Sequence, residues 1–127
     1  MEKTLAPFAP YAYAIMRTIV GLLFVSHGAQ KVFGWFGGQP VPLGSLLGVA
    51  GIIEIVLGLL ITIGLFTSYA AFIASGEMAV AYFVGHFPKS FWPLENQGEP
   101  AVLFCFIFLW MATQGSGIWS VDAARGR

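Results

Sequence analysis

Charged residues are scarce in this sequence, and their scarcity indicates the class of protein. Only 9% of the 127 residues are Asp, Glu, Lys or Arg, while 57% are hydrophobic and 16% are aromatic. Soluble domains carry about 25% charged residues. A chain of this composition lacks the polar groups that a soluble fold places on its surface. The composition therefore predicts an integral membrane protein, with the lipid bilayer as its first partner.

An excess of positive charge is also absent, because six Lys and Arg balance six Asp and Glu. This balance argues against a nucleic acid as a partner. Cysteine is limited to Cys105, which excludes a catalytic dithiol within one protomer and predicts a small buried apolar residue. No cofactor motif is present, since Gly115-Ser116-Gly117 follows no parallel strand and lacks the setting of a dinucleotide site. Any flavin, haem or iron-sulfur group would have to sit on another chain.

Four apolar segments are each about long enough to cross a bilayer, for which a helix needs roughly 20 residues. They cover about residues 11–33, 43–63, 68–87 and 99–113. Short connections make consecutive helices antiparallel neighbours. The prediction is an all-α protein, an integral membrane up-down four-helix bundle that forms a single domain over residues 1–127.

Orientation is predicted from the basic residues near the ends of these segments. The face with both termini carries Lys3, Arg125 and Arg127, and the opposite face carries Lys31 and Lys89. Cytoplasmic segments carry an excess of Lys and Arg. Both termini are therefore expected in the cytoplasm.

Three ionisable residues interrupt the apolar segments: Arg17, Glu54 and Glu77. Counted along the helices at about 1.5 Å per residue, all three fall near the bilayer midplane, so they are expected to meet there. Charges at that depth are costly and are functional candidates by default. The alternative is an ion pair that only fixes helix register and leaves one Glu protonated. The three residues form the candidate polar core.

Glycines lie on the same helical faces as the charges. Gly51 and Gly58 flank Glu54, and Gly21 and Gly28 lie on the charged face of the first segment. Small residues let membrane helices approach closely. These faces are therefore predicted to be the packed ones.

A second polar group is expected nearer the outer surface, where His27, Lys31 and Glu99 come from two segments. Lys31 is predicted to pair with Glu99, whose carboxylate is favoured in the first turn of its helix. The alternative for Lys31 is an interfacial position in which it reaches the headgroups. His27 and His86 lack the spacing of metal ligands, so no metal is predicted.

Short motifs in order along the chain resemble the DoxX family over nearly its whole length. They are Arg17 with Gly21, His27-Gly28 with Lys31, Glu54 with Gly58, the turn at Gly64-Leu65 and Thr67, Met78, the segment 95–99, and the ending Gly115, Gly117, Ser120 and Asp122. The resemblance implies a four-helix protein of the bacterial plasma membrane. It also implies similarity to the small membrane subunits of a thiosulfate:quinone oxidoreductase.

The leading functional hypothesis is a membrane subunit of a redox system that binds a quinone or a similar small aromatic inside the bundle. A quinone needs an apolar slot, donors for its carbonyl oxygens and an acid that supplies protons. The expected walls are Phe24, Phe33 and Trp35; the expected donors are His27 and Lys31; and the expected proton relays are Glu54, Glu77 and Glu99. Any enzyme activity would belong to a quinone-linked oxidoreductase complex with a partner subunit.

Two other classes of function stay open. One is a scaffold or assembly subunit without catalysis, in which the polar core only sets helix register. The other is a small transporter, which would need to oligomerise because four helices make a thin wall. Gly44 and Gly48 offer a face for a homo-oligomer.

Overall fold

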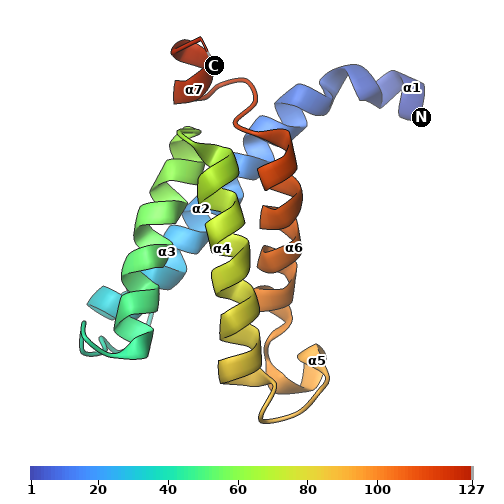
Figure 1. Ribbon diagram of the computed structural model, residues 1–127. Helices are drawn as coiled ribbons and strands as arrows, with labels where there is room; N and C mark the ends of the chain where they lie inside the picture. Colours follow the sequence, from blue (N-terminus) through green and yellow to red (C-terminus); the bar gives the residue numbers. More distant parts are fainter. Residues whose placement is uncertain (127) are drawn as a thin grey trace.

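The computed structural model describes residues 1–126, and every regular element in that part of the chain is a helix. Four long helices run in alternating directions (Figure 1): α2 Ala9–Phe33, α3 Leu46–Ile63, α4 Thr67–Ala81 and α6 Glu99–Gln114. They correspond to the predicted segments 11–33, 43–63, 68–87 and 99–113, so the all-α prediction is confirmed. Shorter helices occupy the ends and connections: α1 Glu2–Leu5, η1 Ala6–Phe8, η2 Tyr82–His86, α5 Pro93–Asn96 and α7 Val121–Ala124.

Glycine ends two of the long helices. Gly34 and Gly64 adopt φ of 73° and 72°, in the left-handed region that residues with a Cβ rarely adopt. The Gly64 amide donates to the carbonyl of Ile61 and satisfies part of the end of α3. After Gly64 only two residues precede α4, so the connection between α3 and α4 is tight.

Helices α2 and α3 pack backbone to backbone through their glycines. A Cβ added at Gly28 would lie 2.5 Å from the Gly51 carbonyl oxygen, and one at Gly58 would lie 2.9 Å from the Val25 nitrogen. Real side chains do not approach that closely, so only glycine permits this spacing. The predicted contact between the glycine faces is confirmed.

Aromatic side chains fill the space between this pair and α6. Phe24 is buried and meets Phe108 with ring centroids 4.8 Å apart, and Phe104 stacks on Phe108 at 5.5 Å. Small residues of α4, including Ala71 and Ala74, complete the core. Bulky rings therefore hold α6 away from α2, whereas glycines draw α3 against it.

The last turn before the loop to α5 is a π-helix, Tyr82–His86, in which the Phe87 amide donates to the Tyr82 carbonyl over 2.9 Å. The sequence predicted a continuous helix to residue 87. A π-helical turn widens the backbone and is often found at functional sites. It changes the direction of the side chains that follow Ala81.

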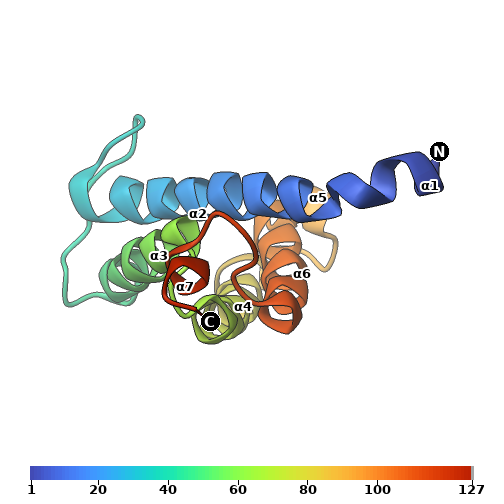
Figure 2. The ribbon, with the colours of Figure 1, turned by 90° about the horizontal axis from the view of Figure 1, so that it is seen from above.

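The two ends of the described chain lie at the same end of the molecule as the turn between α3 and α4, with α7 close to that turn and α1 extending to the side (Figure 1). Seen from above, α1 and the start of α2 extend beyond the other helices (Figure 2). Arg127, one of the basic residues used to predict orientation, lies outside the described residues.

By length and composition, two helical stretches can cross a membrane: Glu2–Phe33 and Leu46–Ile63. Glu99–Gln114 is also apolar but shorter.

Candidate functional site

An ion pair joins the two glycine-packed helices. The Lys31 Nζ atom of α2 lies 2.8 Å from both carboxylate oxygens of Glu54 on α3. The Glu54 side chain is 2% exposed, and that of Lys31 is 25% exposed. The predicted pairing of Lys31 with Glu99 is wrong. Lys31 follows Gly28 on the face that packs on α3, whereas Glu99 is exposed at the start of α6.

Glu77 of α4 faces this pair. Both of its carboxyl oxygens are buried and accept from no N–H or O–H group within residues 1–126, and the carboxyl group lies within hydrogen-bond reach of the Glu54 carboxyl group. Its charged neighbours are Glu54 and Lys31. The site therefore contains one cation and two carboxyl groups, as predicted for the polar core, but the cation is Lys31 and not Arg17.

The prediction that Arg17 meets Glu54 and Glu77 is wrong. Arg17 is 1% exposed, and its guanidinium donates to four backbone carbonyls: Ile61 at 3.1 Å, Ile118 at 3.1 Å, Trp119 at 2.8 Å, and Ser116. Ile61 lies seven residues beyond Glu54, which is roughly 10 Å along the helix. Counting depth from residue 11 assumes that the helix bundle begins there. In the structure the start of α2 extends beyond the other helices (Figure 2), so Arg17 lies at the end of the bundle that carries the C-terminal segment.

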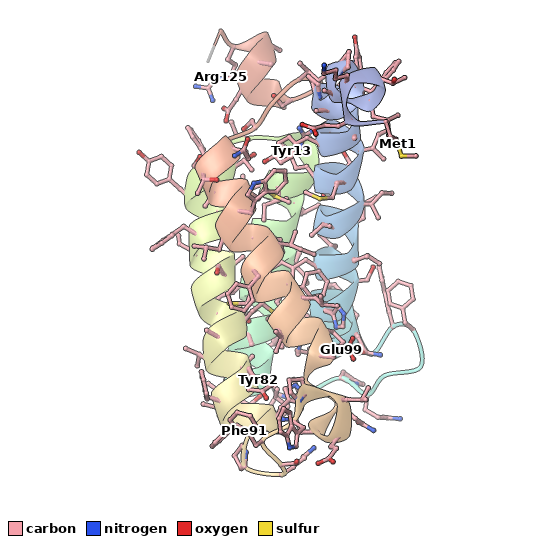
Figure 3. All side chains as sticks on the ribbon, turned by 90° about the vertical axis from the view of Figure 1, so that its right-hand side faces the viewer. Met1, Tyr13, Tyr82, Phe91, Glu99 and Arg125 are labelled. Atoms are coloured by element: carbon pink, nitrogen blue, oxygen red, sulfur yellow. The ribbon has the colours of Figure 1, made fainter. Side chains whose placement is uncertain are left out.

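The ending that contributed to the family resemblance surrounds Arg17. The Asp122 carboxylate accepts from the Phe66 amide at 2.8 Å and from the Ser116 hydroxyl at 2.7 Å. The Tyr13 hydroxyl donates to the Gly115 carbonyl at 2.6 Å, at the end of the molecule opposite Tyr82 and Phe91 (Figure 3). These motif residues hold the C-terminal segment across the ends of α2 and α3, which is a structural role.

A cleft of about 590 Å³ opens between α3 and α4 at the end away from their tight turn. Figure 1 shows the two helices joined at that turn and separating toward their other ends. Lys31, Glu54, Glu77 and His27 line the cleft from α2, α3 and α4. Its remaining walls are mostly apolar and include Leu46, Leu47, Val49, Ile53, Ile73, Val80, Val84 and Phe104.

Two histidines line this cleft in different ways. His27 is exposed, packs edge-on against Phe104 with centroids 5.5 Å apart, and makes no hydrogen bond that the described residues provide. His86 is partly buried, and its Nδ1 lies 3.1 Å from the Asn96 carbonyl oxygen. A carbonyl only accepts, so that nitrogen of His86 must carry the proton.

A second hollow of about 450 Å³, termed the outer groove, lies on the other side of His27. It is lined by Val20, Leu23, His27, Glu99, Pro100, Leu103, Phe104 and Ile107. His27 and Phe104 thus belong to the walls of both hollows. Figure 3 shows Glu99 at the start of α6, near the lower end of α2.

The other residues predicted for the site divide between the cleft and the surface. Phe24 lines the cleft, whereas Glu99 lines only the outer groove. Trp35 is 58% exposed and packs on Phe33 with ring centroids 5.2 Å apart, and neither residue lines the cleft. Phe33 is the last residue of α2 and Trp35 lies in the loop that follows, so both rings lie beyond the cleft.

Two residues that line the cleft, Phe104 and Gly76, could not be predicted from the sequence. Phe104 reads as one more apolar residue of its segment, and nothing marks it as the wall beside His27. Gly76 reads as a packing residue, yet a Cβ there would meet nothing within 4 Å. Residues of this kind can be assigned to the cleft only when the rotation of each helix about its own axis is known.

Comparison with known proteins gives one family and one relative. The sequence model of the family described as DoxX matches residues 12–87. An uncharacterized protein of Haemophilus influenzae is 39% identical to this chain, in an alignment 127 positions long that covers 94% of this chain and 95% of that relative. No solved structure matches.

Proposed function

The chain belongs to the DoxX family and is a membrane protein, and from this premise we propose that its cleft binds a quinone or a similar small aromatic from the bilayer. The observation that carries the proposal is the juxtaposition of Lys31, Glu54 and Glu77 with apolar walls in one cleft. Ligand sites commonly combine apolar walls with a few convergent polar groups. The protein would serve as the membrane subunit of a redox system.

The size of the cleft fits such a ligand. Its volume of about 590 Å³ lies within the usual range for small-molecule sites, about 300 to 1,000 Å³. A single aromatic ring with part of an apolar tail fills a space of this order. The ring would lie near Phe24 and Phe104, with its oxygens toward the polar groups.

The polar groups supply what a quinone requires. Lys31 has three N–H donors, of which Glu54 engages two, so one is left for a carbonyl oxygen. The Glu77 carboxyl group accepts from no N–H group in the described chain, lies beside the Glu54 carboxyl group and can exchange a proton with the ligand. Reduction of a quinone to a hydroquinone takes two electrons and two protons. The protons pass through this chain, and the electrons come from a flavin, haem or iron-sulfur group on a partner subunit.

Access from the bilayer is supported by the apolar flank of the cleft. Leu47 of α3 and Val80 of α4 line it and are more than half exposed. We place all four long helices across the plasma membrane with both termini in the cytoplasm, so this flank faces lipid. A ligand dissolved in the bilayer then enters between α3 and α4.

The test is to purify the protein in mild detergent and quantify bound quinone by mass spectrometry and ultraviolet absorbance. Quinone is expected near one per chain in the wild type and to be lost in Gly76→Phe, which fills the cleft where a Cβ meets no atom. Glu77→Gln is expected to weaken retention. Trp35→Ala is the matched control, since Trp35 lies outside the cleft.

Equal retention in all four proteins would show that any bound quinone lies elsewhere. Phospholipid alone, together with a protein that co-purifies in fixed ratio, would overturn the proposal and favour the scaffold hypothesis.

A further inference from the structure

The Glu54 and Glu77 carboxyl groups need a route for protons. Glu54 is buried, and so are both carboxyl oxygens of Glu77. The flank of the cleft between α3 and α4 offers apolar side chains such as Leu47 and Val80, which carry no proton. A proton therefore reaches the carboxyl groups from another side of the cleft.

The outer groove supplies that side. It shares His27 and Phe104 with the cleft, and its remaining polar side chain is Glu99. Glu99 is exposed in the first turn of α6, where it can exchange protons with water at the membrane surface. His27 is thus the titratable side chain that lines both hollows within residues 1–126.

The two histidines of the cleft differ in their freedom to transfer a proton. His86 is fixed through Nδ1 by the carbonyl of Asn96 and has one ring nitrogen left. The His27 ring touches Phe104 by an edge and has no hydrogen bond that holds it in the described structure. A ring that transfers protons must use both nitrogens or rotate, so the geometry favours His27 over His86.

We infer that His27 transfers protons between the outer groove, where Glu99 lies, and the Glu54 and Glu77 carboxyl groups of the cleft. The neutral imidazole accepts a proton on one ring nitrogen from the groove and becomes a cation. It then releases a proton from its other nitrogen toward a carboxylate, and rotation of the ring restores the starting tautomer. No electron moves in this step, and one proton enters for each proton that leaves.

The charges that face His27 are compatible with this transfer. Lys31 follows it on α2, Glu54 faces it from α3, and both act on the imidazole electrostatically. Glu77 lines the same cleft from α4, and Glu99 lines the groove from α6. Lys31 and Glu54 form an ion pair, and their opposite charges act on the ring in opposite senses. The purpose of the route rests on the proposed quinone function, but its existence can be tested without a ligand.

The experiment is infrared spectroscopy of the full chain in lipid vesicles without quinone. The C=O band of a protonated carboxyl group is identified by its loss in Glu77→Gln or Glu54→Gln. After transfer from H₂O to D₂O, the rate at which the band shifts measures proton exchange. His27→Ala is expected to slow it by about a hundredfold, the scale of a lost acid-base group, and Glu99→Gln is expected to slow it less.

Two comparisons separate proton transfer from a structural role. Imidazole added to the buffer is expected to restore exchange in His27→Ala, because the small ring can occupy the vacated space. His86→Gln is expected to exchange at the wild-type rate. Wild-type exchange in His27→Ala, slowed exchange in His86→Gln, or the absence of any protonated carboxyl band would each overturn the inference. Since no quinone is present, failure of the quinone proposal leaves this result unaffected.

Discussion

The Lys31 and Glu54 side chains lie at the inner wall of the cleft, and their pairing has consequences for both stability and binding. Glu54 is almost fully buried, so its carboxylate relies on the Lys31 ammonium group for compensation. The Lys31 side chain is 25% exposed and lines the cleft. The pair can therefore hold α2 to α3 while it presents one donor to a ligand.

Removal of Lys31 is predicted to destabilise the protein. Lys31→Met leaves the Glu54 charge buried without its partner, and we expect the free energy of unfolding to fall by about 3 kcal/mol. Adding Glu54→Gln to the same chain removes the charge and is expected to recover most of that loss. The measurement is a double-mutant cycle of unfolding in detergent. Lys89→Met is the control, and equal losses in Lys31→Met and Lys89→Met would contradict the prediction.

At the scale of residues, the sequence predicted which side chains are unusual but not which ones meet. An ionisable residue in an apolar segment is visible without coordinates, as Arg17, Glu54 and Glu77 were. Three of the four partners of Arg17 are backbone carbonyls of a segment about a hundred positions away, the fourth is the carbonyl of Ile61, and carbonyls carry no signature in a sequence. Lys31 reaches Glu54 because of the rotation and tilt of α2, which periodicity does not determine.

Among the elements, α2 and α3 form the closest pair, and their contact depends on four glycines. Gly21, Gly28, Gly51 and Gly58 allow the two backbones to touch, and this brings Lys31 within reach of Glu54. The periodicity of small residues predicted these contacts correctly. The π-helical turn at 82–86 was not predictable, because it depends on how the chain continues into the loop before α5.

Substitution of Gly28 is predicted to separate α2 from α3. A Val side chain there would meet the Gly51 carbonyl and Ile55, and overpacking of this kind costs about 1–3 kcal/mol or more. The matched control is Gly76→Ala, where the added Cβ meets nothing within 4 Å. That change is expected to be neutral or to stabilise α4 by up to about 1 kcal/mol. Thermal unfolding in detergent measures both, and a stable Gly28→Val protein would refute the close contact.

Arg17 is predicted to control the order of the C-terminal segment. Arg17→Lys keeps the charge but loses the planar fork that reaches several carbonyls at once. Each hydrogen bond to a charged group contributes about 1.5–3 kcal/mol, so amide exchange across residues 116–122 is expected to accelerate by at least about tenfold. Hydrogen-exchange mass spectrometry reads this directly from the Asp122 amide, which bonds the Gly64 carbonyl. Arg125→Lys is the control, and unchanged protection in Arg17→Lys would contradict the assigned role.

For the whole molecule, the apolar exterior and the common position of the two ends determine how it can sit in a bilayer. Exposed rings such as Phe72 and Phe106 lie along α4 and α6, and the ends of the described chain lie at the end with the α3 to α4 turn (Figure 1). The apolar exterior could be predicted from composition, because the proportions of hydrophobic and charged residues are enough to infer it. The cleft depends on the divergence of two helices and was not predictable.

Cysteine labelling in intact cells tests this arrangement. In a Cys105→Ala background, Lys89→Cys is expected to react with a membrane-impermeant maleimide, because the proposed orientation puts the loop between η2 and α5 outside the cell. Lys3→Cys is expected to react only after permeabilisation, because the N-terminus is cytoplasmic under the proposed orientation. Phe72 is 65% exposed in the isolated chain and faces lipid under the proposed arrangement, so Phe72→Cys is expected to react under neither condition. Labelling of Lys3→Cys in intact cells would reverse the orientation, and labelling of Phe72→Cys after permeabilisation would place α4 outside the hydrocarbon.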